Sequence, residues 1–184
     1  DEGASQYIRG MWLMNELSTD EAIIGWNDNT IKDFHFQTWS AADLFINATF
    51  SRLDFQVKNC NEYLRQTSPA KLSARGVTDA ALLSDISLYR EEARALRAYA
   101  YYNLMDLFGK APFYDENSAV NSQGPEYNRQ QLFTFIESEL NAVLPNLKAP
   151  RANEYGRVDQ GVANMILAKI YLNAEVFIGA PKYT

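Results

Sequence analysis

The segment from Glu91 to Phe113, EEARALRAYAYYNLMDLFGKAPF, constrains the fold of this chain more than any other. Apolar and small side chains recur along it at steps of three and four, in two adjacent stripes, which predicts a long helix covered on more than one side. Gly109 can adopt the left-handed conformation that ends a helix, and Pro112 cannot continue one. The segment is therefore expected to be a buried helix followed by a sharp stop and an extended exit.

A weaker copy of this segment returns 70 residues later. Each copy ends in a glycine and then reaches a proline, Pro112 in the first and Pro181 in the second. The offset is about twice the ~34-residue period of a tetratricopeptide unit, so the copy indicates an internal structural repeat. The identical positions are Ala93, Ala98, Tyr101, Asn103 and Gly109, which recur as Ala163, Ala168, Tyr171, Asn173 and Gly179.

Apolar spacing along the rest of the chain predicts further helices, and the expected fold class is all-α. The helices should cover about 5–17, 41–65, 79–108, 129–146 and 159–178. Residues 1–184 would then form tetratricopeptide-like helix pairs over about 41–108 and 129–178, an α-solenoid with loop-rich insertions. Pro145 should end or kink its helix. The expected N-terminal caps are Ser40, Thr78 or Asp79, Asn128 and Asp159.

Residues 18–38 depart from this helical pattern. They are rich in Asp, Asn, Gly and Trp, which predicts a loop with a short strand near 34–36. Loops of this length inside a compact domain are uncommon and often functional. We therefore interpret residues 18–40 as a candidate ligand-facing loop.

Charge and motif content exclude several classes of function. The net charge is −6 and no run of basic residues occurs, which argues against a nucleic-acid surface. The sequence has no nucleotide-binding glycine loop, no G-x-S-x-G motif and no Cys/His cluster, so no cofactor and no metal are expected. Cys60 lies on an apolar spacing and is expected to be a small buried hydrophobe. No stretch of 18 apolar residues is present to span a membrane.

The 18–43 region collects the side chains that sugar capture requires. Flat aromatic rings stack on the C–H faces of sugar rings, and planar polar groups bind pairs of hydroxyls. Trp39 also precedes a predicted helix N-terminus, where a ligand would meet free backbone N–H groups. The alternative is that Trp39 packs on Leu44 or Phe45 and staples the helix start. The candidate ligand-binding residues are Trp39, Asp20, Trp26, Asp28, Asn29 and Asp43.

Four segments together resemble the SusD/RagB-like family, the starch-utilisation-system lipoproteins of the outer membrane. They are ELSTDEAIIGWND (16–28), HFQTWSAADLFINATFSRL with VKNCNEYL behind it (35–64), EEARALRAYAYYNLMDLFGKAPFY (91–114) and GRVDQGVANMILAKIYLNAEVFIGAPKY (156–183). The third is the most specific, because an Ala-Arg-rich helix that ends in Phe-Gly before a proline is similar to the signature of that family. The four segments cover nearly the whole chain, in family order.

The resemblance implies that residues 1–184 are the N-terminal portion of a SusD-like domain. It implies a non-enzymatic glycan-binding subunit of a TonB-dependent uptake complex, which captures an oligosaccharide or polysaccharide and hands it to a SusC-like barrel. It also implies a place on the extracellular face of the outer membrane, through a lipid on an N-terminal cysteine that this chain lacks. By the same resemblance, Trp39 corresponds to the stacking position and Asp20 to a hydroxyl partner.

Two other functions are weighed against this one. A helix-pair solenoid commonly presents a concave face to a protein or peptide, so the chain could be an interaction scaffold or a RagB-type peptide-binding subunit docked on a transporter. An exposed, flat tryptophan in the 18–43 region would favour the glycan function, and buried tryptophans would favour the scaffold. An enzyme is disfavoured because the sequence shows no nucleophile–base set.

Overall fold

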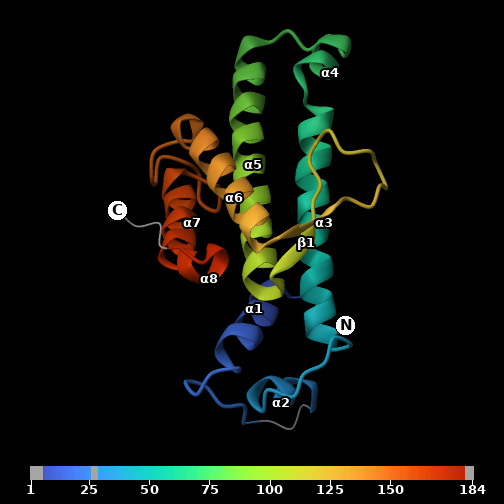
Figure 1. Cartoon of the computed structure of the whole chain (residues 1–184). Coiled ribbons are helices and arrows are strands. Elements are labelled where there is room, and N and C mark those ends of the chain that lie inside the picture. The colour runs from blue at the N-terminus through green and yellow to red at the C-terminus, as the bar shows by residue number, and fades with distance from the viewer. Residues whose placement is uncertain (1–5, 26–28, 181–184) are drawn as a thin grey trace. The chain divides into compact units, whose positions relative to one another are not determined.

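The computed structural model describes residues 6–25 and 29–180 (Figure 1). Regular structure in these residues is almost entirely helical, which confirms the predicted all-α class. The chain divides into two compact units, Asp1–Phe55 and Gln56–Thr184. Helix α3 (Leu44–Gln66) begins in the first unit and ends in the second.

The first unit contains α1 (Tyr7–Glu16), α2 (Asn29–His35) and the first half of α3. The expected strand near 34–36 is wrong, because this part of the chain is the end of α2. Ile31 and Phe34 lie one helical turn apart, and both are buried in the core of the unit. That core consists of Leu13, Leu17, Ile31, Phe34 and Phe45.

Helix α3 begins three residues later than expected, and its cap is Asp43 rather than Ser40. The Asp43 carboxylate accepts hydrogen bonds from the backbone N–H of Phe45 at 2.8 Å and of Ile46 at 3.1 Å. These bonds satisfy two of the donors that a helix start leaves open. The Ser40 hydroxyl accepts from the N–H of Ala42, before the helix begins.

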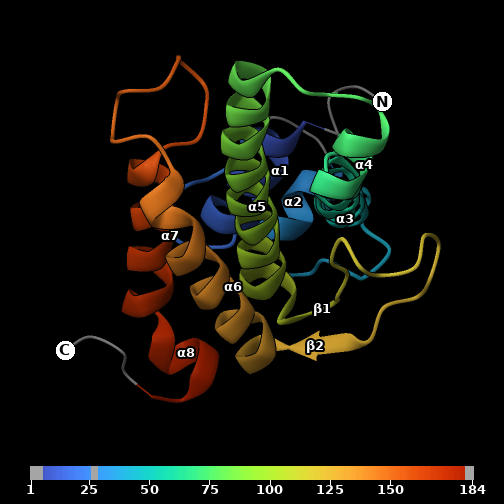
Figure 2. The same ribbon diagram turned by 90° about the horizontal axis from the view of Figure 1, so that it is seen from above.

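The second unit is built around the long helix α5 (Ala80–Phe108). The short helix α4 (Pro69–Ala74) connects α3 to α5, and α6 (Arg129–Val143) packs along α5 on another side. Helix α7 (Gln160–Leu172) contacts both α5 and α6, and Figure 2 shows α5 in the middle of this group. A two-stranded antiparallel sheet, β1 (Lys110–Pro112) with β2 (Glu126–Asn128), joins α5 to α6.

The caps that the sequence predicts for this unit are confirmed. Asp79 accepts from the N–H of Leu82, and Asp159 accepts from the N–H of Val162. Asn128 and Gln131 form a capping box, in which each side chain bonds the backbone N–H of the other. Gly109 ends α5 with φ at 74°, in the left-handed region that favours glycine.

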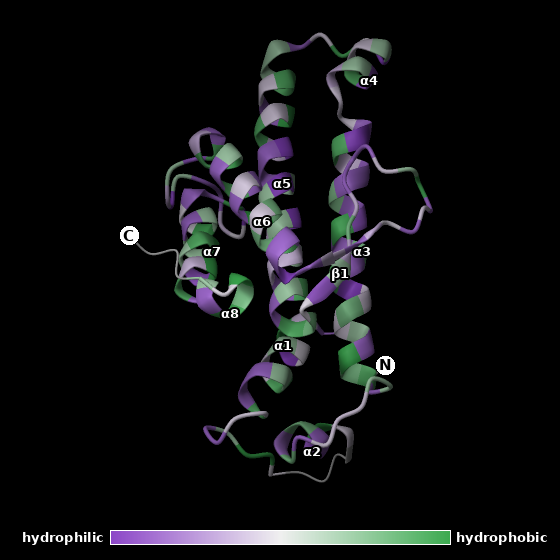
Figure 3. Ribbon diagram, viewed as in Figure 1, coloured by the Kyte–Doolittle hydropathy of each residue, from purple (hydrophilic) through white to green (hydrophobic). Residues whose placement is uncertain are grey.

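The last predicted helix is interrupted, and this corrects the expected 159–178 span. Helix α7 ends at Leu172, and α8 (Ala174–Ile178) follows after Asn173. Helix α7 carries apolar residues on its outer side as well as its buried side, as Figure 3 shows by hydropathy. As expected, α6 stops before Pro145, which lies in a 3-10 turn over Leu144–Asn146.

Candidate functional site

Trp39 lies at the surface of the first unit and rests on a buried ring. Its side chain remains 44% exposed, whereas Phe34 beneath it is 2% exposed. The two ring centroids are 6.0 Å apart and the ring planes differ by 24°, so the rings are stacked. Trp39 thus contacts α2 through Phe34. Phe34 therefore anchors an indole that stays accessible to a ligand.

The backbone before Trp39 is held by hydrogen bonds from both ends of the predicted loop. Gln37 adopts a positive φ of 55°, and its side-chain amide donates to the carbonyl of Ser18 at 2.8 Å. Thr38 donates from its backbone N–H to the carbonyl of Asp33 and from its hydroxyl to the Asp33 carboxylate. These bonds terminate α2 and fix the direction in which the chain reaches Trp39.

The other predicted ligand residues occupy different settings. Asp20 is exposed, while Asp43 is buried and caps α3. Asn29 is the first residue of α2. Trp26 and Asp28 lie outside the described residues. Among the members of this set whose exposure the structure describes, Trp39 and Asp20 lie at the surface of the first unit.

Phe36 is an exposed aromatic residue outside the predicted ligand set. It remains 64% exposed, and its ring meets that of His35 edge-on with centroids 4.9 Å apart. An aromatic residue three positions before Trp39, in a segment rich in polar residues, is the signal that would have found it. His35, the sole histidine, is half-buried, and its Nδ1 atom is buried without a hydrogen-bond partner.

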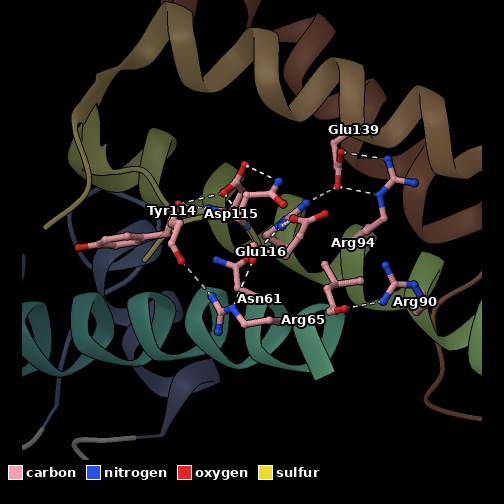
Figure 4. Close-up of polar contacts among 12 residues, drawn as sticks. Asn61, Arg65, Arg90, Arg94, Tyr114, Asp115, Glu116 and Glu139 are labelled. Carbon is pink, nitrogen blue, oxygen red and sulfur yellow. Dashed lines mark hydrogen bonds and ion pairs between the residues drawn. The ribbon is translucent and has the colours of Figure 1, made fainter. Parts of the chain in front are cut away.

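A polar assembly in the second unit centres on Arg97, which is buried. Figure 4 shows three of its members, Asn61, Glu116 and Glu139. The Arg97 guanidinium donates to Asn61 Oδ1 at 2.6 Å, to Glu116 Oε2 at 2.5 Å and to Glu139 Oε1 at 2.6 Å. Arg94 adds two bonds to the Glu139 carboxylate. Burial raises the pKa of Glu116, but the hydrogen bond and the charge of Arg97 outweigh it and hold the pKa below its usual value.

This assembly fastens the loop between β1 and β2. Arg65 of α3 donates to the carbonyls of Glu116 and Ser118, each at 3.3 Å. The Tyr101 hydroxyl donates to the carbonyl of Tyr114 and accepts from its N–H. A cleft of about 670 Å³ lies between this loop and α3. The carboxylates that line it already accept hydrogen bonds from within the protein, Glu62 from Arg65 and Asp115 from Ser118. We therefore interpret the polar groups of this cleft as contacts that hold the loop in place.

The part of the chain that the structure describes contains no cluster of three or more His, Cys, Asp or Glu side chains placed to hold a metal ion. Among the same residues, no helix combines the length and the apolar character that crossing a membrane would need.

The chain is similar to a curated protein over its whole length. It is 35% identical, across 184 residues, to the starch-binding protein SusD of Bacteroides thetaiotaomicron. The chain is a homologue of SusD. It spans 31% of the length of SusD. No protein-family model matches it.

Solved structures show that the fold of this SusD-like chain is shared more widely. A SusD superfamily protein from Bacteroides vulgatus superposes with a TM-score of 0.71 at 17% identity, over 94% of this chain and 37% of that one. The surface glycan-binding protein A from Bacteroides uniformis gives a TM-score of 0.68 at 23% identity, over 95% of this chain and 41% of that one. At these identities the likeness concerns the fold, and it agrees with the tetratricopeptide-like helix pairs predicted from spacing.

Proposed function

We propose that this SusD-like chain serves in a glycan-binding surface subunit of a nutrient uptake complex. The subunit captures an oligosaccharide for import and is not an enzyme. Its similarity to a protein named for starch binding supports the ligand class. The fold it shares with a surface glycan-binding protein is compatible with that role.

The observation that carries the proposal is the exposed indole of Trp39 on the buried ring of Phe34. Supported from below, the indole presents a flat apolar surface whose orientation is fixed before a ligand arrives. Such a surface matches the C–H face of a sugar ring, and preorganisation lowers the entropy cost of binding. Asp20, also exposed, supplies a carboxylate for a pair of sugar hydroxyls.

The proposed partner is a SusC-like TonB-dependent barrel in the outer membrane, with the subunit on the extracellular face and anchored by a lipid in the intact protein. The family relationship supports this placement. The net charge of −6 is unsuited to nucleic acid.

The test is isothermal titration with maltoheptaose, the starch fragment chosen because SusD is starch-binding. Trp39→Ala should weaken binding about tenfold, which corresponds to about 1.4 kcal/mol. Trp12→Ala is the matched control, because Trp12 is also in the first unit and is similarly exposed at 47%. Equal affinities for Trp39→Ala and the wild type would remove Trp39 from the site, and no binding of any oligosaccharide by the wild type would overturn the function.

A further inference from the structure

The second unit carries an aromatic platform of its own, at the junction of β2 and α6. The Phe113 and Tyr127 rings are parallel within 4°, with centroids 4.2 Å apart. Phe113 also stacks on Tyr101, which has no exposed surface, and Phe135 meets both Phe113 and Tyr101 edge-on. The platform is therefore fixed to the core by Tyr101. Because Phe113 covers one face of Tyr127, the opposite face is the one that a ligand can meet.

Two amide side chains next to this ring are oriented by the capping box. The Asn128 oxygen accepts from the backbone N–H of Gln131, and the Gln131 oxygen accepts from that of Asn128, both at 3.0 Å. Each amide uses its oxygen in this way, so each exposed NH₂ group remains as a hydrogen-bond donor held in place. Paired donors beside an aromatic face are what the hydroxyls and the ring of a sugar require.

The groove that contains these groups is open and uncharged. It has a volume of about 610 Å³, and the described residues that line it are aromatic, amide or hydroxyl side chains. A neutral ligand avoids the cost of desolvating a charge without a partner. An anionic sugar, or a peptide whose charged side chains need counterions, would find no such partner among these lining residues.

We propose that this groove binds a neutral oligosaccharide through Tyr127, with Asn128, Gln130 and Gln131 as hydrogen-bonding partners. Its residues belong to the second unit, whereas Trp39 belongs to the first. The inference rests on the proposed function only for the class of ligand. Tyr127 supplies the stacking surface, and the first turn of α6 supplies the donors.

Heteronuclear NMR of the 184-residue chain tests both sites at once. The reporters are the indole N–H of Trp39 and the side-chain NH₂ groups of Asn128, Gln130 and Gln131. The probes are maltoheptaose, laminariheptaose, xylohexaose and mannohexaose, each titrated separately. The proposal predicts saturable shifts of the three amide groups with at least one probe.

Each outcome decides between the two proposals. Shifts at Trp39 alone overturn the groove and leave the proposed function standing. Shifts at the α6 amides alone support the groove and remove Trp39 from the site. Shifts at both support both, and no shift at either with any probe overturns both.

Variants separate stacking from folding. Tyr127→Ala should abolish the amide shifts, while Tyr127→Phe, which keeps the ring stack, should retain binding within about twofold. Tyr155→Ala is the control, because Tyr155 is a fully exposed tyrosine of the same unit outside the groove. Unchanged amide shifts in a folded Tyr127→Ala protein would overturn the role of this ring.

Discussion

The guanidinium of Arg97 lies 2.6 Å from the carboxylate of Glu139, and water reaches little of either side chain, with 3% and 12% exposed. Arg97 belongs to α5 and Glu139 to α6, so the pair joins the two helices that pack most extensively in the second unit. The same guanidinium also meets Asn61 of α3 and Glu116 of the loop after β1. One buried cation thus connects four segments that are distant in sequence.

Replacing Arg97 with methionine should destabilise the protein strongly. The substitution keeps much of the side-chain volume but leaves Glu116 and Glu139 without this cation, and breaking a buried ion pair from one side costs about 3–5 kcal/mol. Urea denaturation followed by far-UV circular dichroism measures the loss in the free energy of unfolding.

Lys110→Met is the matched control for that experiment. Lys110 pairs with Glu126 at 2.9 Å, but both side chains are more than 60% exposed. An exposed pair contributes only about 0–1 kcal/mol. If the two methionine variants lost the same small free energy, the buried network would have no special role in stability.

Stability should also fall in acid because of Glu116. Its pKa in the folded protein lies below its ordinary value of 4.5, since the bond and charge of Arg97 outweigh the effect of burial. The stabilising contribution is therefore complete above about pH 4.5 and is lost as the pH falls through the folded-state pKa. Urea midpoints measured from neutral pH into acid should decline less steeply for Glu116→Gln than for the wild type. Parallel pH profiles for the two proteins would contradict the assignment.

Cys60 should be inert in the native protein. Burial raises the pKa of its thiol from 9.0 to about 11, against a smaller lowering by the Arg97 charge. A shift of about two units cuts the reactive thiolate fraction about 100-fold at pH 8, and burial also blocks access. Labelling with a chromogenic disulfide reagent should be at least 100-fold slower than in concentrated guanidinium chloride. Equally rapid labelling in both conditions would show that the α3 face bearing Cys60 opens readily.

Local signals in the sequence predicted much of the helical framework. Asp79, Asn128 and Asp159 were identified as caps because each precedes an apolar pattern of helical period, and each accepts the expected backbone bond. Capping depends on three or four consecutive residues, so it can be read without knowledge of the fold. The prediction that Ser40 caps α3 is wrong. Asp43 takes this role because it stands closer to the first apolar residue of the helix and its carboxylate is the stronger acceptor.

The contacts that build the sites could not be read locally. Arg97 is 36 residues from Asn61 and 42 residues from Glu139. The sequence alone does not show which distant side chains an arginine on a helix will contact. Helix α2 was missed because it has only seven residues, too few for a periodic signal. The residue type of Trp39 makes it a candidate in the sequence. Its stacking on Phe34 could not be predicted, because it depends on residues 29–35 forming a helix where a strand is expected.

Replacing Gly109, which ends α5 as predicted from the sequence, should destabilise the protein. Its φ of 74° is costly for residues with a Cβ, by about 1–2 kcal/mol, so Gly109→Ala should lower the free energy of unfolding by about that amount. Gly109→Asn should cost less, since Asn tolerates this conformation better. Gly25→Ala is the control, because an added Cβ there meets nothing within 4 Å and the backbone is not left-handed. Thermal and urea unfolding of the three variants would rank them, and a neutral Gly109→Ala would mean that the chain can leave α5 by another route.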